Sequence, residues 1–252
     1  MRYIEKTIEQ PAVITDFIKR QMDGRAADGD PAAWKRLGVD YTSFGGGVIL
    51  PLLISEQHGL CAYTGVGIDD RLDKRQPRRL APPRDDYWFK PQVEHLKSQA
   101  QCRAELEAQG LVPEKDPGED MDYHSMVAAL EVAGTRSEWF GASHRENNPF
   151  TVWPTHAGCE SRFRYSRDNG AMEGVDEDAQ STVDTLLLNH FTLRSWRKGW
   201  IDGFLDPEVI VSREDYEAII HIMNQIVGGK MEEFCFVVKA VAQAELSLIG
   251  EV

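Results

Sequence analysis

The stretch FKPQVEHLKSQ, Phe89 to Gln99, places a glutamate directly beside a histidine after a short apolar start. One interpretation is a surface loop that carries two polar residues. The other is a metal ligand, Glu94, next to a general base, His95, because a carboxylate suits Mg²⁺ or Mn²⁺ and an imidazole can take a proton from water. In a regular strand two neighbours point to opposite faces, whereas at a strand end or bulge they can converge on one ion. The pair alone does not decide between these interpretations.

Composition is that of a soluble globular protein. The chain has 252 residues, of which 42% are hydrophobic and 27% charged, enough for a sizeable core. The opening MRYIEKTIEQ lacks the apolar core of a signal peptide, and no apolar run has membrane-spanning length, so we expect a cytoplasmic protein. The four cysteines are scattered without a CxxC pair, which predicts neither a disulfide framework nor an intact zinc knuckle.

The net charge of −13 argues against a protein that grips nucleic acid unaided, since such proteins present a basic face to the phosphates. Basic residues gather locally, however. Residues 71–84, RLDKRQPRRLAPPR, carry six Arg or Lys against one Asp, and within them Arg75, Arg78 and Arg79 are the candidate nucleic-acid contacts. The alternative is a solvated loop.

The order of local patterns predicts an α+β fold, with a small mixed centre between two helical flanks. Helices are expected behind Pro11 and Pro51, a strand and tight turn in LCAYTGVGI, an extended piece in QVEHLKS, and a hairpin around Asn169-Gly170. From Asp178 onward the pattern is helical. We therefore divide the chain into an N-terminal helical segment (1–60), a mixed centre (61–175) and a C-terminal helical region (176–252), packed as one compact unit.

Several segments, taken in order, resemble one family. EQHGLCAYTG is similar to Q-x-G-x-C-A-Y-C-E, VEHLKSQ to I-E-H-F-x-P-K-S, and TVDTLLLNHFTLRSWR to T-I-x-x-L-N-L-N-x-x-x-L-x-x-x-R. These are patterns of the HNH endonucleases, and among them of the PtuB-like subunits of Septu and retron anti-phage systems. The similarity runs to about Phe204, and its most specific parts are the segment around Cys61 and the spacing from Asn189 to Arg197.

The resemblance implies that residues 61–175 hold an HNH ββα-metal centre in which His95 activates water and Glu94 binds one Mg²⁺ or Mn²⁺ ion. The family's central Asn falls on Ser125, whose hydroxyl reaches less far than an amide, and the neighbouring His124 is a substitute.

The last position of the HNH motif falls in GASHREN. His144 is the first candidate for this metal-binding position, and Asn147 and Asn148 are the alternatives. A loop histidine facing solvent is the competing interpretation of His144.

In the family, two cysteine pairs hold a structural Zn²⁺. This chain keeps only Cys61, and the other three positions are Thr64, Leu130 and Phe140. One thiol cannot build a four-coordinate site, so we expect a small hydrophobic cluster in place of the structural zinc.

Two functional hypotheses follow. In the first, the chain is an active HNH endonuclease that cuts DNA within a higher-order anti-phage defence complex. Because the chain is acidic, a PtuA-like ATPase partner would provide or complete the DNA-binding surface. In the second, the HNH centre has decayed and the chain is an interaction or regulatory subunit. The apolar helices after Asp206 fit a domain core or a partner surface.

Overall fold

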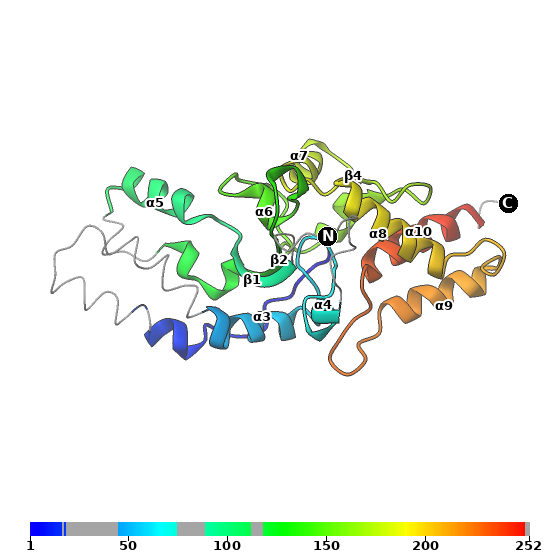
Figure 1. The fold of residues 1–252 in the computed structure, drawn as a ribbon, viewed down its shortest axis with the longest axis horizontal. Helices are drawn as coiled ribbons and strands as arrows, with labels where there is room; N and C mark the ends of the chain where they lie inside the picture. The colour runs from blue at the N-terminus through cyan, green and yellow to red at the C-terminus, as the bar shows by residue number, and fades with distance from the viewer. Residues whose placement is uncertain (17, 19–44, 75–88, 112–117, 250–252) are drawn as a thin grey trace.

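The computed structural model describes residues 1–16, 18, 45–74, 89–111 and 118–249, and confirms a mixed α+β fold (Figure 1). Residues 12–16 are helical. The α-helices are α3 (Leu50–Glu56), α4 (Asp70–Lys74), α5 (Gln99–Ala108), α6 (Ala142–Arg145), α7 (Glu177–Thr185), α8 (Phe191–Phe204), α9 (Arg213–Met223) and α10 (Cys235–Ile249). Shorter turns of helix are η1 (Gly45–Ile49), η2 (Glu119–Met121), η3 (Tyr123–Ser125), η4 (Arg136–Glu138) and η5 (Cys159–Arg162). The strands are β1 (Phe89–His95), β2 (Met126–Val132), β3 (Phe163–Tyr165) and β4 (Met172–Gly174).

The strands β1 and β2 form an antiparallel pair at the centre of the molecule (Figure 1). Their register places Phe89 opposite Val132 and His95 opposite Met126. The connection between them contains α5, η2 and η3, so the pair is not a tight hairpin. Six of the seven residues of β2 are buried, whereas every residue of β1 keeps some exposure.

A compact turn at residues 60–67 packs on β2. Leu60 pairs with Gly67, and the Cys61 N–H donates to the Val66 carbonyl at 2.8 Å. The Gln57 side chain accepts from the Ala128 N–H at 2.7 Å and donates to the Ala128 and Leu60 carbonyls, each at 2.8 Å. Gln57 therefore ties the turn to the centre of β2.

The Asn189-to-Arg197 spacing has a structural explanation. The Asn189 side chain accepts from the N–H of Met172 and donates to its carbonyl, both at 2.8 Å, so the amide continues the pairing of β4 as a backbone would. Arg197 is buried and donates to the carbonyls of Gly170 and Leu188 at 2.7 Å. Gly170 has a φ of 66°, and a Cβ there would lie 2.3 Å from the Arg194 carbonyl oxygen.

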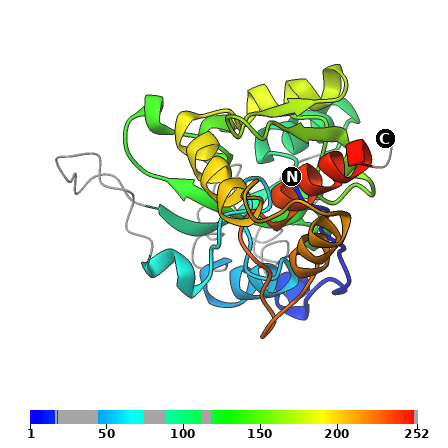
Figure 2. The same ribbon diagram turned by 90° about the vertical axis from the view of Figure 1, so that its right-hand side faces the viewer.

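The C-terminal helices α8, α9 and α10 lie together at one end of the molecule, and α10 packs on α9, α8 and β3 (Figures 1 and 2). Local signals in the sequence begin several of these helices: Ser98, Asp176 and Ser212 cap α5, α7 and α9. A single cluster of buried apolar side chains runs from Met1 to Ala242 and joins the three predicted segments. Within the described residues, no helix is long and apolar enough to cross a membrane.

Candidate functional site

The predicted pair Glu94–His95 ends strand β1. Pairing with β2 continues through His95, so the strand is regular at this point and the two side chains leave it on opposite faces. The Glu94 side chain is 15% exposed. The Nε2 atom of His95 is inaccessible to solvent. The pair therefore belongs to a partly buried strand, not to a surface loop.

Three successive residues of the short helix α6 contact three different elements. The Ser143 hydroxyl accepts from the N–H of Val132, at the end of β2, at 2.8 Å. The His144 Nδ1 lies 3.1 Å from the Thr185 carbonyl oxygen at the end of α7. The Arg145 side chain reaches the end of β1. This four-residue helix is a junction between the central strand pair and the C-terminal part of the chain.

Arg145 is fully buried and binds Glu94. Its Nη1 donates to Glu94 Oε1 at 2.6 Å and to the His95 carbonyl at 2.8 Å. Its Nη2 donates to the Leu96 carbonyl at 2.7 Å, and its Nε to the Asn148 carbonyl at 2.9 Å. The guanidinium carbon also lies 4.7 Å from the centre of the Phe150 ring. Arg145 thus joins the end of β1 to the loop after α6.

The surroundings shift the pKa values of both predicted catalytic groups. Burial raises the pKa of Glu94 to about 7, although the Arg145 guanidinium and the Tyr63 hydroxyl act to lower it. Burial, together with the Arg145 charge, lowers the pKa of His95 to about 4. At neutral pH His95 is therefore uncharged, the state that a general base requires.

Tyr63 is a member of this site that sequence reasoning missed. It is 1% exposed and makes an edge-to-face contact with Phe150, with ring centroids 5.6 Å apart. Its hydroxyl lies close enough to Glu94 to affect the pKa of that carboxyl, yet it makes no hydrogen bond of normal geometry. Burial raises the pKa of Tyr63 itself. A buried polar atom is thus directed toward the Glu94–Arg145 pair.

Each predicted metal position makes a contact within the protein. Glu94 is bound by Arg145, His144 contacts Thr185, and Asn148 contributes its backbone carbonyl to Arg145. Among the residues that the structure describes, no three His, Cys, Asp or Glu side chains are grouped so that they could hold a metal ion. In this conformation the donor set at Glu94 does not fit a divalent cation, because Arg145 holds one carboxylate oxygen and the described residues offer no set of three ligands there.

Ser125 and His124 precede β2. Ser125 is buried, and its carbonyl accepts from the Leu96 N–H at 2.8 Å, one step beyond the His95–Met126 pair. The His124 Nδ1 atom lies 3.0 Å from Asp122 Oδ1, and the His124 side chain is half exposed. The structure thus brings Ser125 next to the end of β1, while the His124 ring lies over the preceding turn.

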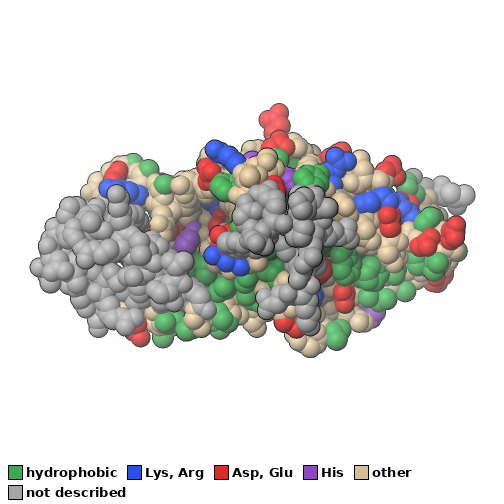
Figure 3. Space-filling model, viewed as in Figure 1, with side chains coloured by type: hydrophobic (Ala, Val, Ile, Leu, Met, Phe, Trp, Pro, Cys, Tyr) green, Lys and Arg blue, Asp and Glu red, His purple; other side chains and the backbone are tan. Residues whose placement is uncertain are grey.

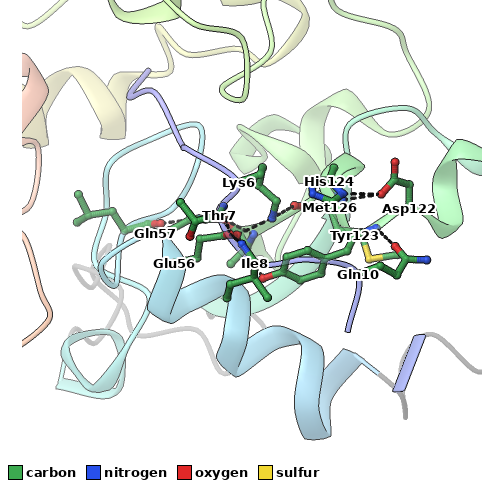
Figure 4. Close-up of polar contacts among 12 residues, drawn as sticks. Lys6, Thr7, Ile8, Gln10, Glu56, Gln57, Asp122, Tyr123, His124 and Met126 are labelled. Atoms are coloured by element: carbon green, nitrogen blue, oxygen red, sulfur yellow. Dashed lines mark hydrogen bonds and ion pairs between the residues drawn. The ribbon is translucent and has the colours of Figure 1, made fainter. Parts of the chain in front are cut away.

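A buried ion pair fixes that turn (Figure 4). Lys6 Nζ lies 2.6 Å from Glu56 Oε2, donates to the Met126 carbonyl at 3.1 Å and sits 3.9 Å from the centre of the Tyr123 ring. The Tyr123 hydroxyl donates to Glu56 at 3.2 Å. Both charged side chains are less than a tenth exposed, and burial lowers the pKa of Lys6. The network anchors the N-terminal segment to α3 and to the start of β2.

The four positions that the resemblance assigns to zinc ligands lie in the core. Cys61, Thr64, Leu130 and Phe140 are each at most 3% exposed. The Leu130 N–H donates to the Cys61 sulfur at 3.2 Å, and a Cβ on Gly141, next to Phe140, would lie 3.6 Å from the Thr64 methyl. Cys61, Leu130 and Phe140 belong to the main apolar core, and the bond from Leu130 to Cys61 joins the turn at 60–67 to β2.

A second feature lies at the C-terminal end. A hollow of about 650 Å³ opens between the loop after α8, the start of α9 and the end of α10. It is lined mainly by Pro207, Ile210, Val211, Tyr216, Leu248 and Ile249, with the Arg167–Glu245 ion pair at its side. Val211 is 70% and Leu248 63% exposed. Figure 3 shows apolar side chains interspersed with acidic ones at this end of the molecule.

The predicted nucleic-acid contacts Arg75, Arg78 and Arg79 lie outside the described residues. Comparison with protein-family models and with curated proteins found no match to this chain. The functional proposal therefore rests on the residues around Glu94.

Proposed function

We propose that this chain is an HNH-type endonuclease that hydrolyses phosphodiester bonds in DNA, as the nuclease subunit of an anti-phage complex with a PtuA-like ATPase. The observation that supports the proposal best is the packing of Glu94 and His95, at the end of β1, against the residues that follow β2. The strands β1 and β2 pair and α6 contacts the ends of both, which is compatible with a ββα arrangement that carries α5, η2 and η3 as an insertion between its strands.

In this proposal His95 is the general base. Its pKa of about 4 leaves the ring neutral at physiological pH but makes it a weak proton acceptor, so action as a base requires its surroundings to change. The shielded Nε2 has to become accessible when DNA or the partner binds. The resemblance assigns a divalent cation to Glu94, but in the conformation described here one oxygen of that carboxylate binds Arg145.

A plasmid-cleavage assay in Mg²⁺ or Mn²⁺ tests the proposal, with the chain alone and with a PtuA-like ATPase. Wild type should convert supercoiled plasmid to open-circular or linear forms, and His95→Ala should lose at least a hundredfold of that rate. His221→Ala, an exposed histidine on α9, is the matched control and should cut like wild type. Equal cleavage by wild type and His95→Ala would refute the role of His95.

The second candidate function is a non-catalytic subunit that binds a partner protein. Two observations favour it: Arg145 occupies Glu94, and the hollow at the C-terminal end exposes Val211 and Leu248. Val211→Asp with Leu248→Asp should then abolish co-purification with the ATPase, whereas Val48→Asp, at a half-exposed site on η1, should not. Loss of the complex without any cleavage by wild type would favour this candidate over the nuclease.

A further inference from the structure

We propose that the hollow at the C-terminal end docks a helix of a partner protein, one that presents aliphatic side chains flanked by lysine or arginine. The inference extends the second candidate function, from which it takes the hollow as a docking surface, and it does not require nuclease activity. Two observations support it: the exposed apolar side chains around the hollow, and the acidic side chains beside them.

The apolar side chains stand at the edges of the hollow. Val211, on the loop after α8, and Leu248, in the last turn of α10, line it from two sides and are 70% and 63% exposed. Val209, in the same loop, is 65% exposed. A small apolar molecule in so open a hollow would stay largely in water, whereas a helix laid across it would cover these side chains.

The charged residues around the hollow are mostly acidic. Residues 206–217 include five acidic side chains and a single arginine. The arginines at the hollow are already paired, Arg213 with Glu217 and Arg167 with Glu245. The exposed carboxylates that make no ion pair among the described residues are those of Asp206, Glu208 and Glu214. The surroundings therefore favour a cationic partner.

The same charges disfavour other occupants. DNA and an anionic membrane surface are both negatively charged and would be repelled by these carboxylates. A second copy of this chain in a symmetric contact would bring the same carboxylates face to face. An apolar surface flanked by lysine or arginine satisfies both features of the hollow.

The backbone beside the hollow favours a helix over an extended segment. A strand that adds to an edge needs free N–H and C=O groups there. From 208 to 211 every backbone N–H already donates to an oxygen of Asp206 or Asp215, and Pro207 has none. The opposite wall is the helix α10, whose backbone is bonded within itself. A partner helix needs only side-chain contacts at this surface.

Synthetic peptides of about 18 residues, long enough to form a helix, are the probes. The first has Leu on one face and Lys on the other. The second has Glu in place of Lys, and the third is the Leu/Lys peptide with two central prolines, which break the helix. Fluorescence anisotropy of the labelled peptides measures binding to the full chain. Wild type should bind the Leu/Lys peptide roughly tenfold or more tightly than either of the others.

One pair of variants tests the apolar contact. Val211→Ser with Leu248→Ser removes apolar surface without adding charge, and should weaken binding of the Leu/Lys peptide roughly tenfold. Val48→Ser with Leu111→Ser is the matched control, because these aliphatic side chains, 46% and 42% exposed, do not line the hollow. It should bind as wild type does, and circular dichroism checks that both variants are folded.

A second pair tests the charges. Glu208→Gln with Glu214→Gln should weaken binding of the Leu/Lys peptide roughly threefold or more. Glu173→Gln with Glu177→Gln removes two exposed carboxylates from β4 and α7, which do not line the hollow. The two variants have the same net charge, so an equal loss in both would show only a general attraction to an acidic chain and would overturn the inference.

Three further outcomes would overturn it: no binding of the Leu/Lys peptide by wild type, equal binding of the peptide with prolines, or unchanged binding by Val211→Ser with Leu248→Ser. The peptide assay contains no DNA, so its result is separate from plasmid cleavage. A nuclease that does not bind the peptide would remove only this inference, and peptide binding without cleavage would remove only the nuclease.

Discussion

Arg145 and Glu94 are 51 positions apart in the sequence, yet their side chains meet at 2.6 Å in the interior of the protein. Neither residue has another charged partner of comparable burial among the described contacts. Their pairing closes the end of β1 against α6. The Arg145 charge also contributes to the lowered pKa of the neighbouring His95.

Arg145→Ala should lower the free energy of unfolding by about 3 to 5 kcal/mol, because it leaves the Glu94 carboxylate and three carbonyls buried without their donor. Arg136→Ala is the matched control, since its side chain is 77% exposed and its ion pair with Glu146 spans 3.5 Å. We expect less than about 1 kcal/mol there. Urea unfolding of both variants measures the difference, and equal effects would contradict the account of Arg145.

Stability should depend on pH through Glu94. Its pKa is raised on folding from 4.5 to about 7, so the folded state binds this proton more tightly than the unfolded state. The associated stability is present below pH 4.5 and is lost as pH rises through 7, about 3 kcal/mol in all. Wild type should therefore lose stability relative to Glu94→Gln between pH 4.5 and 7.5.

The pKa of His95 falls on folding, so His95 changes the free energy of unfolding with pH in the opposite direction to Glu94. Because wild type and Glu94→Gln both contain His95, its effect largely cancels when the two are compared. Urea titrations at several pH values measure the difference between wild type and Glu94→Gln. Glu131→Gln, on the facing strand, is the control for the change in stability with pH that follows from removing any glutamate. A difference that stays flat across this range would show that Glu94 keeps its ordinary pKa.

Asn189→Ala should destabilise the protein by about 2 kcal/mol, because the N–H and carbonyl of Met172 lose their partner amide. Asn224→Ala removes an exposed side chain that donates to the Ile220 carbonyl and accepts a 3.4 Å bond from Lys239, and should cost less than about 0.5 kcal/mol. Thermal or urea unfolding separates the two. If Asn189→Ala also abolished DNA cleavage while leaving stability unchanged, the residue would belong to the functional site instead.

The cluster at Cys61, Thr64, Leu130 and Phe140 should hold the turn at 60–67 without metal. Leu130→Ala should cost about 2 to 5 kcal/mol through loss of packing, whereas Leu111→Ala, at 42% exposure, should cost less than about 1 kcal/mol. Incubation with a zinc chelator should leave the melting temperature unchanged. A chelator-induced fall in that temperature would instead reveal a structural zinc site.

Much of the fold could be predicted from local signals. Pro51, Ser98 and Ser212 mark the starts of helices because their effect is confined to one turn of chain, and Asn169-Gly170 marks the β3–β4 turn for the same reason. The mixed centre between helical flanks follows from the order of these signals.

The environment of the candidate site could not be predicted, because it depends on contacts between distant segments. Glu94–His95 was identified, but nothing in VEHLKSQ indicates that Arg145 binds the carboxylate or that Tyr63 lies beside it. The only local hint was the arginine that directly follows His144 in GASHREN. Likewise, the spacing of Asn189 and Arg197 was recognised as specific, but its role in pairing with β4 and Gly170 required the structure.

The most direct test of the proposed nuclease is the rate at which purified protein cuts supercoiled plasmid in Mn²⁺, with a PtuA-like ATPase present, for wild type and His95→Ala side by side. The account predicts cleavage by wild type and its loss in His95→Ala, with both proteins equally folded by circular dichroism. Equal cleavage by the two proteins, or none by wild type under any metal or partner condition, would contradict it.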